Sequence, residues 1–205
     1  HTFRAMGARR VLIDGAAGRK SLAGAEPGAC AILCVGASMD GGVSAIAAET
    51  AHTCRLFATP EAEHTGLWSA LSRETARYAL YTLEGERLPL ALEENGQPRW
   101  HELPREKCVL WIGGGVTGPT LRTLARRGAP IVLAAPDATH FLCDRTSTET
   151  FHRCGGELLV RQKLTIAAVT ANPWSAYGKH LDGAELLRAL RSVVTVPVVN
   201  VKGEN

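Results

Sequence analysis

The sequence predicts an α/β protein: a mostly parallel sheet flanked by helices, with a small antiparallel β-hairpin insertion, in a single domain over residues 1–205. Two observations lead to this prediction. Short apolar runs that stop at glycine or proline alternate with stretches of helical character, which is typical of buried parallel strands joined by helices. Residues 78–104 depart from this alternation and contain two extended segments around tight turns.

The first predicted strand is the apolar run 11–13, which stops at Asp14 and breaks into a glycine-bearing turn. At the carboxyl end of a parallel strand, a carboxylate can hold a metal, and glycines let backbone amides approach an anion. Asp14 is therefore predicted to be a catalytic and metal-holding acid, and Gly15, Arg19 and Lys20 to bind a cofactor. A buried strand followed by a polar turn is the alternative interpretation.

The turn after Asp14 is not a P-loop. That phosphate-binding pattern needs a glycine directly before the lysine and a helix directly after the following hydroxyl residue. Here Arg19 precedes Lys20, and Ser21 leads into Leu-Ala-Gly-Ala-Glu-Pro-Gly, which forms helices poorly. If a nucleotide binds this fold, Asp14 is a better candidate for the acid beside its metal than Lys20 is for a phosphate clamp.

Residues 29–35 predict the next strand. This continuous apolar run ends at Gly36, which is typical of a strand covered on both faces. It places Cys30 and Cys34 on the same face, which we expect to be buried. The six cysteines are scattered, without a C-x-x-C pair or a zinc-finger spacing, and therefore predict reduced thiols in a cytoplasmic protein.

A helix and the hairpin insertion follow. Residues 43–55 predict a helix, with Ser38 or Asp40 as its cap. Residues 78–104 predict the insertion, in which Asn95-Gly96 is the strongest hairpin signal of the chain. The insertion is expected either to cover a site or to form a surface for a partner.

The remaining elements continue the alternation of strands and helices. The last helix begins near Asp182 with the spacing of a capping box, because Glu185 stands three residues later. The longest extended stretch is interrupted by the charges of Arg161 and Lys163. The predicted strands are 108–112, 130–135, 158–170 and 196–201, and the predicted helices are 119–127, 146–154 and 182–191.

The most glycine-rich stretch of the chain, Gly113–Gly118, lies between a predicted strand and a predicted helix. A strand, a glycine loop and a helix N-terminus together form a ready anion site. Gly113, Gly114, Gly115 and Thr117 are therefore predicted to bind a cofactor. A strand-to-helix turn without any ligand is the alternative.

Polar side chains also follow two other predicted strands. Asp137, Thr139 and His140 are candidates for the rim of a site, with a hydrogen-bonded loop histidine as the alternative for His140. Asn172 is followed by Pro173, which restricts the backbone before it and fixes the turn. Asn172 is therefore predicted to bind a cofactor.

Composition excludes few function classes. The chain has 45% hydrophobic and 21% charged residues and a formal net charge of +3, which is ordinary for a globular protein and gives no argument for nucleic acid. No apolar run approaches the roughly 20 residues of a membrane span. Neither nucleic acid nor a membrane is therefore expected as a partner. No Ser/His/Asp or Cys/His set stands in a recognisable nucleophile context.

Three segments together, residues 11–21, 31–40 and 170–178, resemble the family of the small reactivase subunit of lysine 5,6-aminomutase and its uncharacterised relatives. The resemblance implies a nucleotide-linked reactivase or chaperone-type component for a cobalamin-dependent aminomutase in amino-acid fermentation, with ATP or GTP and Mg²⁺ as cofactors. The implied partner is the aminomutase or a second reactivase subunit, and a homo-oligomer is a further expected assembly. Such a chain would be a switch and a docking surface.

Members of that family carry a P-loop segment before the acid-bearing strand, and this sequence has none. The chain is therefore expected to correspond to the C-terminal part of a longer nucleotide-binding protein, with ATPase- or GTPase-like activity only when an upstream segment is present. The alternative is a stand-alone α/β domain or enzyme that binds a phosphorylated small molecule at Gly113–Gly118. A partner-binding domain without a ligand is a third interpretation.

Overall fold

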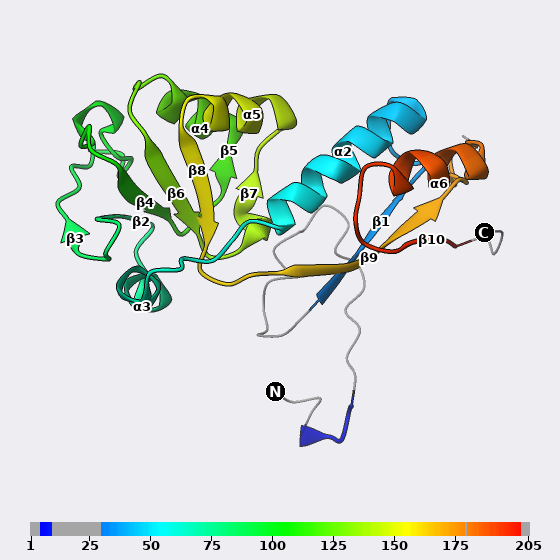
Figure 1. The fold of residues 1–205 in the computed structure, drawn as a ribbon, viewed down its shortest axis with the longest axis horizontal. Helices are drawn as coiled ribbons and strands as arrows, with labels where there is room; N and C mark the ends of the chain where they lie inside the picture. Colours follow the sequence, from blue (N-terminus) through cyan, green and yellow to red (C-terminus); the bar gives the residue numbers. More distant parts are fainter. Residues whose placement is uncertain (1–4, 10–29, 179, 202–205) are drawn as a thin grey trace.

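The parallel strands are divided between two sheets in the computed structural model, which describes residues 5–9, 30–178 and 180–201 (Figure 1). One sheet has five strands in the order β3-β2-β4-β6-β8, and the other has three in the order β1-β9-β10. A further short pair joins β5 (Val116–Thr117) to β7 (Phe141–Leu142). The α/β class predicted from the sequence is confirmed.

The five-stranded sheet contains the parallel strands β4 (Cys108–Ile112), β6 (Ile131–Ala135) and β8 (Gly156–Val160). Every residue of β4 and β6 is buried, because helices cover both faces. Helix α3 (Thr65–Arg73) packs on one face, and α4 (Gly118–Ala125) and α5 (Arg145–Arg153) pack on the other (Figure 1). Such continuous apolar strands are expected where both faces are covered.

The hairpin insertion forms the antiparallel part of this sheet. Strand β2 (Tyr78–Tyr81) pairs antiparallel with both β4 and β3 (Arg87–Leu88). A bridge between Leu92 and Pro98 closes the second turn, in which Gly96 has a φ of 76°. The two turns predicted in this segment are therefore confirmed.

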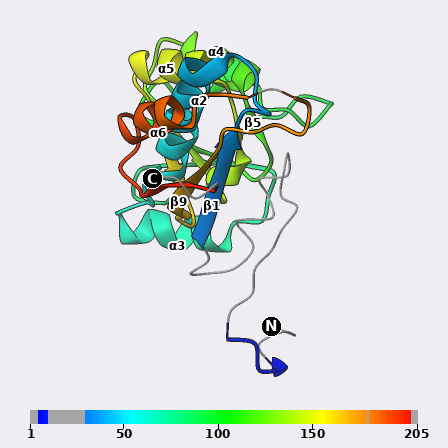
Figure 2. The same cartoon turned by 90° about the vertical axis from the view of Figure 1, so that its right-hand side faces the viewer.

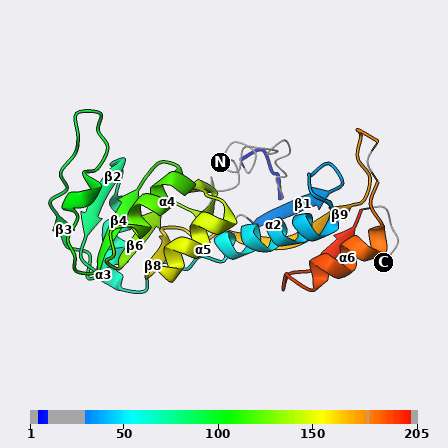
Figure 3. The same ribbon diagram turned by 90° about the horizontal axis from the view of Figure 1, so that it is seen from above.

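The three-stranded sheet is entirely parallel. It consists of β1 (Cys30–Gly36), β9 (Thr165–Asn172) and β10 (Val198–Asn200). Helices α2 (Gly42–Phe57) and α6 (Gly183–Arg191) lie together on one of its faces (Figures 2 and 3). The connection from β1 to β9 and the connection from β9 to β10 both move in the same direction across the sheet. Because such crossovers between parallel strands are right-handed, the helices α2 and α6 of these connections lie on the same face.

The prediction that β1 is covered on both faces is wrong. Val35 is buried toward the helices, whereas Cys30, Ile32 and Cys34 are exposed on the opposite face. The sequence pattern could not show this, because the exposed positions are as apolar as the buried ones. The structure therefore leaves an apolar sheet face open among the described residues.

The predicted extended stretch 158–170 is two strands rather than one. Strand β8 ends at Val160 and β9 begins at Thr165, so residues 161–164 carry the chain from the five-stranded sheet to the three-stranded one. The charged residues Arg161 and Lys163 lie in this connection between the two sheets. Within the described residues, no helix is both long and apolar enough to cross a membrane.

Candidate functional site

The structure brings the glycine loop and the predicted rim residues to one place. Strand β5 (Val116–Thr117) pairs in parallel with β7 (Phe141–Leu142), so that Val116 lies opposite Phe141. Gly115 and His140 directly precede these paired residues. The loops that follow β4 and β6 therefore run side by side at the carboxyl edge of the five-stranded sheet.

Packing explains two of the three consecutive glycines. A Cβ atom on Gly113 would lie 2.8 Å from the carbonyl oxygen of Ala76, and one on Gly115 would lie 2.9 Å from Cδ1 of Leu142. A Cβ atom on Gly114 would meet nothing within 4 Å. These close approaches explain why Gly113 and Gly115 are glycines without any ligand. They therefore favour the interpretation of this loop as a strand-to-helix turn.

A carboxylate of the chain itself lies at the N-terminus of α4, next to the predicted binding residue Thr117. Oδ2 of Asp144 is 2.6 Å from where a Cβ atom of Gly118 would stand. Asp144 accepts hydrogen bonds from the amide and hydroxyl of Ser147, which are the main cause of its lowered pKa, and lies 3.6 Å from Nη1 of Arg122. A phosphate at this helix end would meet that negative charge, which weakens the case for an anion site there.

His140 is a loop histidine held by Asp137. Oδ1 of Asp137 accepts hydrogen bonds from the amide of Thr139 at 2.8 Å and from its hydroxyl at 2.5 Å, and lies 3.2 Å from Nδ1 of His140. Burial raises the pKa of Asp137, but the hydrogen bonds from His140 and Thr139 outweigh it and leave the pKa below its usual value. The carboxylate of Asp137 therefore orders the turn over residues 137–140.

A second group of polar residues lies at the carboxyl edge of the three-stranded sheet. Gly36 at the end of β1 is opposite Asn172 at the end of β9, and the amide of Ala37 donates to the carbonyl of Asn172 at 2.9 Å. A Cβ atom on Gly36 would lie 2.0 Å from that carbonyl oxygen. Only glycine permits this approach, which joins segments 31–40 and 170–178, two of the three that carry the family resemblance.

Hydrogen bonds tie the two loops together. Oδ1 of Asn172 accepts from the amide of Trp174 at 3.1 Å, so this predicted ligand-binding residue orders its own turn. Oγ of Ser175 accepts from the amide of Tyr177 at 3.1 Å and from the hydroxyl of Ser38 at 3.3 Å. The loop after β1 and the loop after β9 thus share a pair of hydroxyl groups.

Helix α2 begins beside these loops. Its N-cap residue is Gly41, with a φ of 92°, so the N-cap position supplies no side-chain acceptor, and Gly42 follows with a φ of 74°. The prediction that Ser38 or Asp40 is the N-cap residue is therefore wrong, because two left-handed glycines lead into the helix. The first turn contains no acidic residue, and its amides give this end of a 16-residue helix partial positive charge.

Two exposed aromatic side chains belong to the same edge. Trp174 is 55% exposed and Tyr177 is 87% exposed, although both follow an ordered strand. The ring of Trp174 lies 4.4 Å from that of His180 in an edge-to-face arrangement. No sequence pattern marks these two residues as part of a site, and the fixed turn after Asn172 is the only local signal near them. Together the two loops present amides, hydroxyls and flat apolar surfaces.

The structure does not unite all the predicted site residues. Asn172 ends a strand of the three-stranded sheet, whereas Gly113, Gly114, Gly115 and Thr117 follow a strand of the five-stranded sheet (Figure 1). The remaining predicted residues, Asp14, Gly15, Arg19 and Lys20, lie outside the described residues. Within the part of the chain that the structure describes, no group of three or more His, Cys, Asp or Glu residues can hold a metal ion.

Comparisons with models of protein families, with curated proteins and with solved structures gave no match. The resemblance to the aminomutase reactivase family therefore stays a prediction from the sequence.

Proposed function

We propose that this chain is a nucleotide-linked component of reactivase or chaperone type, which binds ATP or GTP and acts with a protein partner. The observation that supports this best is the N-terminus of α2, which Gly41 leaves without a side-chain cap beside the joined loops after β1 and β9. Helix N-termini that follow a strand and a glycine turn bind phosphate through backbone amides. The site lies at the carboxyl edge of a parallel sheet, where ligands of α/β proteins bind.

Each part of the site has a role in this proposal. The first-turn amides of α2 bind phosphate oxygens, and the hydroxyls of Ser38 and Ser175 add hydrogen bonds. Tyr177, which is 87% exposed, is proposed to stack on the base, and Trp174, in edge-to-face contact with His180, to border the same surface. Mg²⁺ bound with a nucleotide keeps most of its ligands from phosphates and water, so it needs few ligands from the protein.

The partner proposed from the sequence resemblance is a cobalamin-dependent aminomutase or a second reactivase subunit. Exchange of a damaged, tightly held cofactor requires the partner to open. A nucleotide can shift the equilibrium between the closed and the open complex only if it binds one of these two states more tightly than the other. The chain then acts as a switch and a docking surface.

The proposal is tested by thermal unfolding of the full chain with Mg·ATP and Mg·GTP. Ligand at about 100 times its dissociation constant stabilises the folded state by roughly 2.7 kcal/mol. Trp174→Ala should reduce the shift by removing the border of the stacking surface. Trp68→Ala is the matched control, because Trp68 is 46% exposed on α3 of the other sheet. The absence of any shift, or an equal loss in both variants, would contradict the proposal.

The alternative function, binding of a phosphorylated small molecule at Gly113–Gly118, is opposed by the carboxylate of Asp144 beside that helix end. The same thermal experiment includes sugar phosphates as ligands. A shift with sugar phosphates that grows in Asp144→Asn and is unchanged in Trp174→Ala would favour the glycine loop over the α2 site.

A further inference from the structure

Within the part of the chain that the structure describes, strand β1 is the least protected edge of the two larger sheets. Four strands lie at sheet edges, namely β1, β10, β3 and β8. Exposed edges carry unpaired backbone groups that can pair with another chain, and proteins usually protect them with charges, prolines, short strands or covering segments.

The edges of the five-stranded sheet are both protected. Strand β3 has only two residues and includes Arg87. Along β8, the amide of Val160 donates to the carbonyl of Pro60 at 2.9 Å, so a separate segment covers the strand end. The start of β8 carries Glu157, whose Oε1 lies 2.6 Å from Nζ of Lys107.

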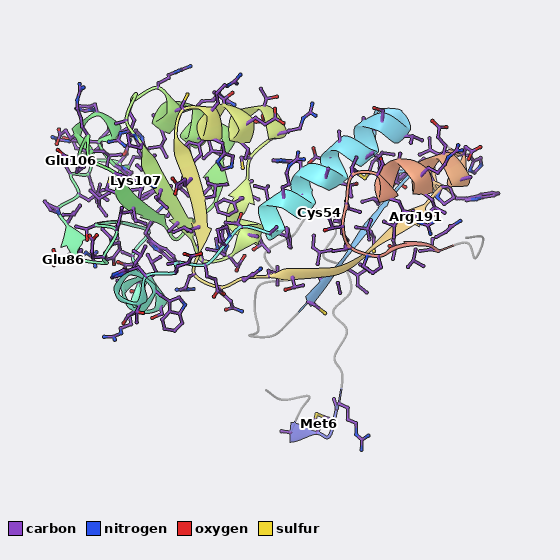
Figure 4. The ribbon with its side chains drawn as sticks, in the orientation of Figure 1. Met6, Cys54, Glu86, Glu106, Lys107 and Arg191 are labelled. Atoms are coloured by element: carbon purple, nitrogen blue, oxygen red, sulfur yellow. The ribbon has the colours of Figure 1, made fainter. Side chains whose placement is uncertain are left out.

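The far edge of the three-stranded sheet is protected as well. Pro197 directly precedes β10 and has no amide hydrogen to donate. Arg191 lies on α6 (Figure 4). Its Nη2 donates to the carbonyl of Val198 at 3.3 Å. A charged side chain thus occupies an acceptor of this three-residue strand.

Among the described residues, none of these features protects strand β1. Its seven residues, Cys-Ala-Ile-Leu-Cys-Val-Gly, include no charge and no proline, and among the described strands it has a partner on one side only. Cys30, Ile32 and Cys34 share one face and are exposed, Ile32 by 57%. A long, neutral, apolar edge favours pairing with a strand of the same character.

The backbone register defines which residues can pair. The amide of Ala37 donates to Asn172 of β9, and in a parallel sheet successive residues direct their backbone groups to opposite sides. Leu33 and Val35 therefore direct their amides and carbonyls toward β9, while Ile32 and Cys34 direct theirs outward. Ile32 stands near the middle of the strand with an outward amide and an outward carbonyl. The pairing with β9 shifts register between Ala31 and Ile32, but the alternating exposure of Cys30, Ile32 and Cys34 continues across this shift.

We propose that β1 pairs antiparallel with β1 of a second copy of this chain, about a two-fold axis at Ile32. In this register Ile32 faces Ile32 of the other copy, and Cys30 faces Cys34. The strand is complementary to itself, because every opposed pair is neutral and apolar and the central residues exchange both hydrogen bonds. The two sheets then form one continuous six-stranded sheet.

The first test is the mass of the full chain in solution by light scattering after size exclusion. The wild-type chain should have twice the mass of one chain, and Ile32→Lys should have the mass of one. Val199→Lys is the control, since Val199 is 47% exposed on the open face but lies in β10, and it should remain a dimer. A wild-type monomer, or a dimer that survives Ile32→Lys, would overturn the proposal.

The second test uses the cysteines as probes of register. A short bismaleimide should cross-link two chains, and Cys30→Ser and Cys34→Ser should each abolish the cross-link, because every opposed pair needs both residues. Circular dichroism checks that each variant is folded. A cross-link that still joins the remaining cysteine of this pair, Cys30 or Cys34, to the other chain in either variant would refute this register. Protection of both thiols in a monomer would show that another segment of the same chain covers β1, which also refutes the proposal.

Discussion

Buried Glu74 shows how the acids of this protein are used for structure. Its carboxylate accepts hydrogen bonds from the amides of Thr75 at 2.8 Å and Ala76 at 2.7 Å and from the hydroxyl of Tyr81, and it lies 3.1 Å from Nη1 of Arg87. Burial raises the pKa of Glu74, but these partners outweigh it and the net pKa is lowered. Burial and Glu74 raise the pKa of Tyr81 to about 12.

Glu74→Gln should lower the free energy of unfolding by roughly 1–3 kcal/mol at neutral pH, because donors around the site lose their charged acceptor. A carboxyl whose pKa is lower in the folded state stabilises the protein above its unfolded pKa. The difference between wild type and variant should therefore shrink as pH falls below about 4. Urea unfolding across this range measures it, and a difference that does not depend on pH would contradict the assignment.

Gly36 is required by the approach of its backbone to Asn172, so Gly36→Ala should destabilise the protein by roughly 1–3 kcal/mol or more, as an overpacked contact does. Gly114→Ala is the matched control, since a Cβ atom there meets nothing within 4 Å. It should leave stability nearly unchanged. Denaturant unfolding of both variants distinguishes the two positions. Equal losses of stability would show that the backbones of Gly36 and Asn172 do not pack closely against each other.

At the level of single elements, much of the molecule could be predicted from local signals. Asp182 accepts from the amide of Glu185 at 2.8 Å, as the capping-box spacing predicts, and Asn95-Gly96 forms the expected turn. These features depend on residues close in sequence. The N-cap of α2 is Gly41 rather than Ser38 or Asp40, because Gly41 and Gly42 lead into the helix with positive φ. Ser38 instead bonds to Ser175, 137 residues away, and such a partner cannot be recognised locally.

Helix α2 gives a prediction in which stability and binding change in opposite directions. Ser44 is exposed at the third position after the N-cap Gly41. Ser44→Asp adds a negative charge to the positive helix end and should raise the free energy of unfolding by about 0.3–1 kcal/mol. Ser44→Asn is the neutral control of nearly the same shape. Equal free energies of unfolding for Ser44→Asp and Ser44→Asn at low salt would show that the N-terminus of α2 has no positive electrostatic potential strong enough to stabilise an anion.

At the scale of the whole molecule, the division of the strands between two sheets could not be predicted. Both sheets have apolar parallel strands followed by helices, so the periodicity of each segment is the same in either sheet. Which sheet a strand joins depends only on the strand with which it pairs. For example, β9 pairs with β1 and not with β8, which precedes it in the chain. The same division separates Asn172 from the glycine loop and leaves one face of β1 open.

Helix α2 links the two sheets. It covers the three-stranded sheet, and Nε2 of His52 lies 2.9 Å from the carbonyl oxygen of Cys143, in the segment between β7 and α5. Leu56 and Phe57 at its C-terminus belong to one hydrophobic core with Leu110 of β4 and Leu186 of α6. A ligand at the N-terminus of α2 would therefore contact an element that is continuous with both sheets.

The most direct test of nucleotide binding at α2 is titration calorimetry of the full chain with Mg·ATP and Mg·GTP, in the wild type and in the two Ser44 variants. The wild type and Ser44→Asn should bind at least one of the nucleotides with similar affinity. Ser44→Asp should bind it at least tenfold more weakly, because the added carboxylate repels the phosphates. No binding by the wild type, or equal affinity in all three proteins, would contradict the account.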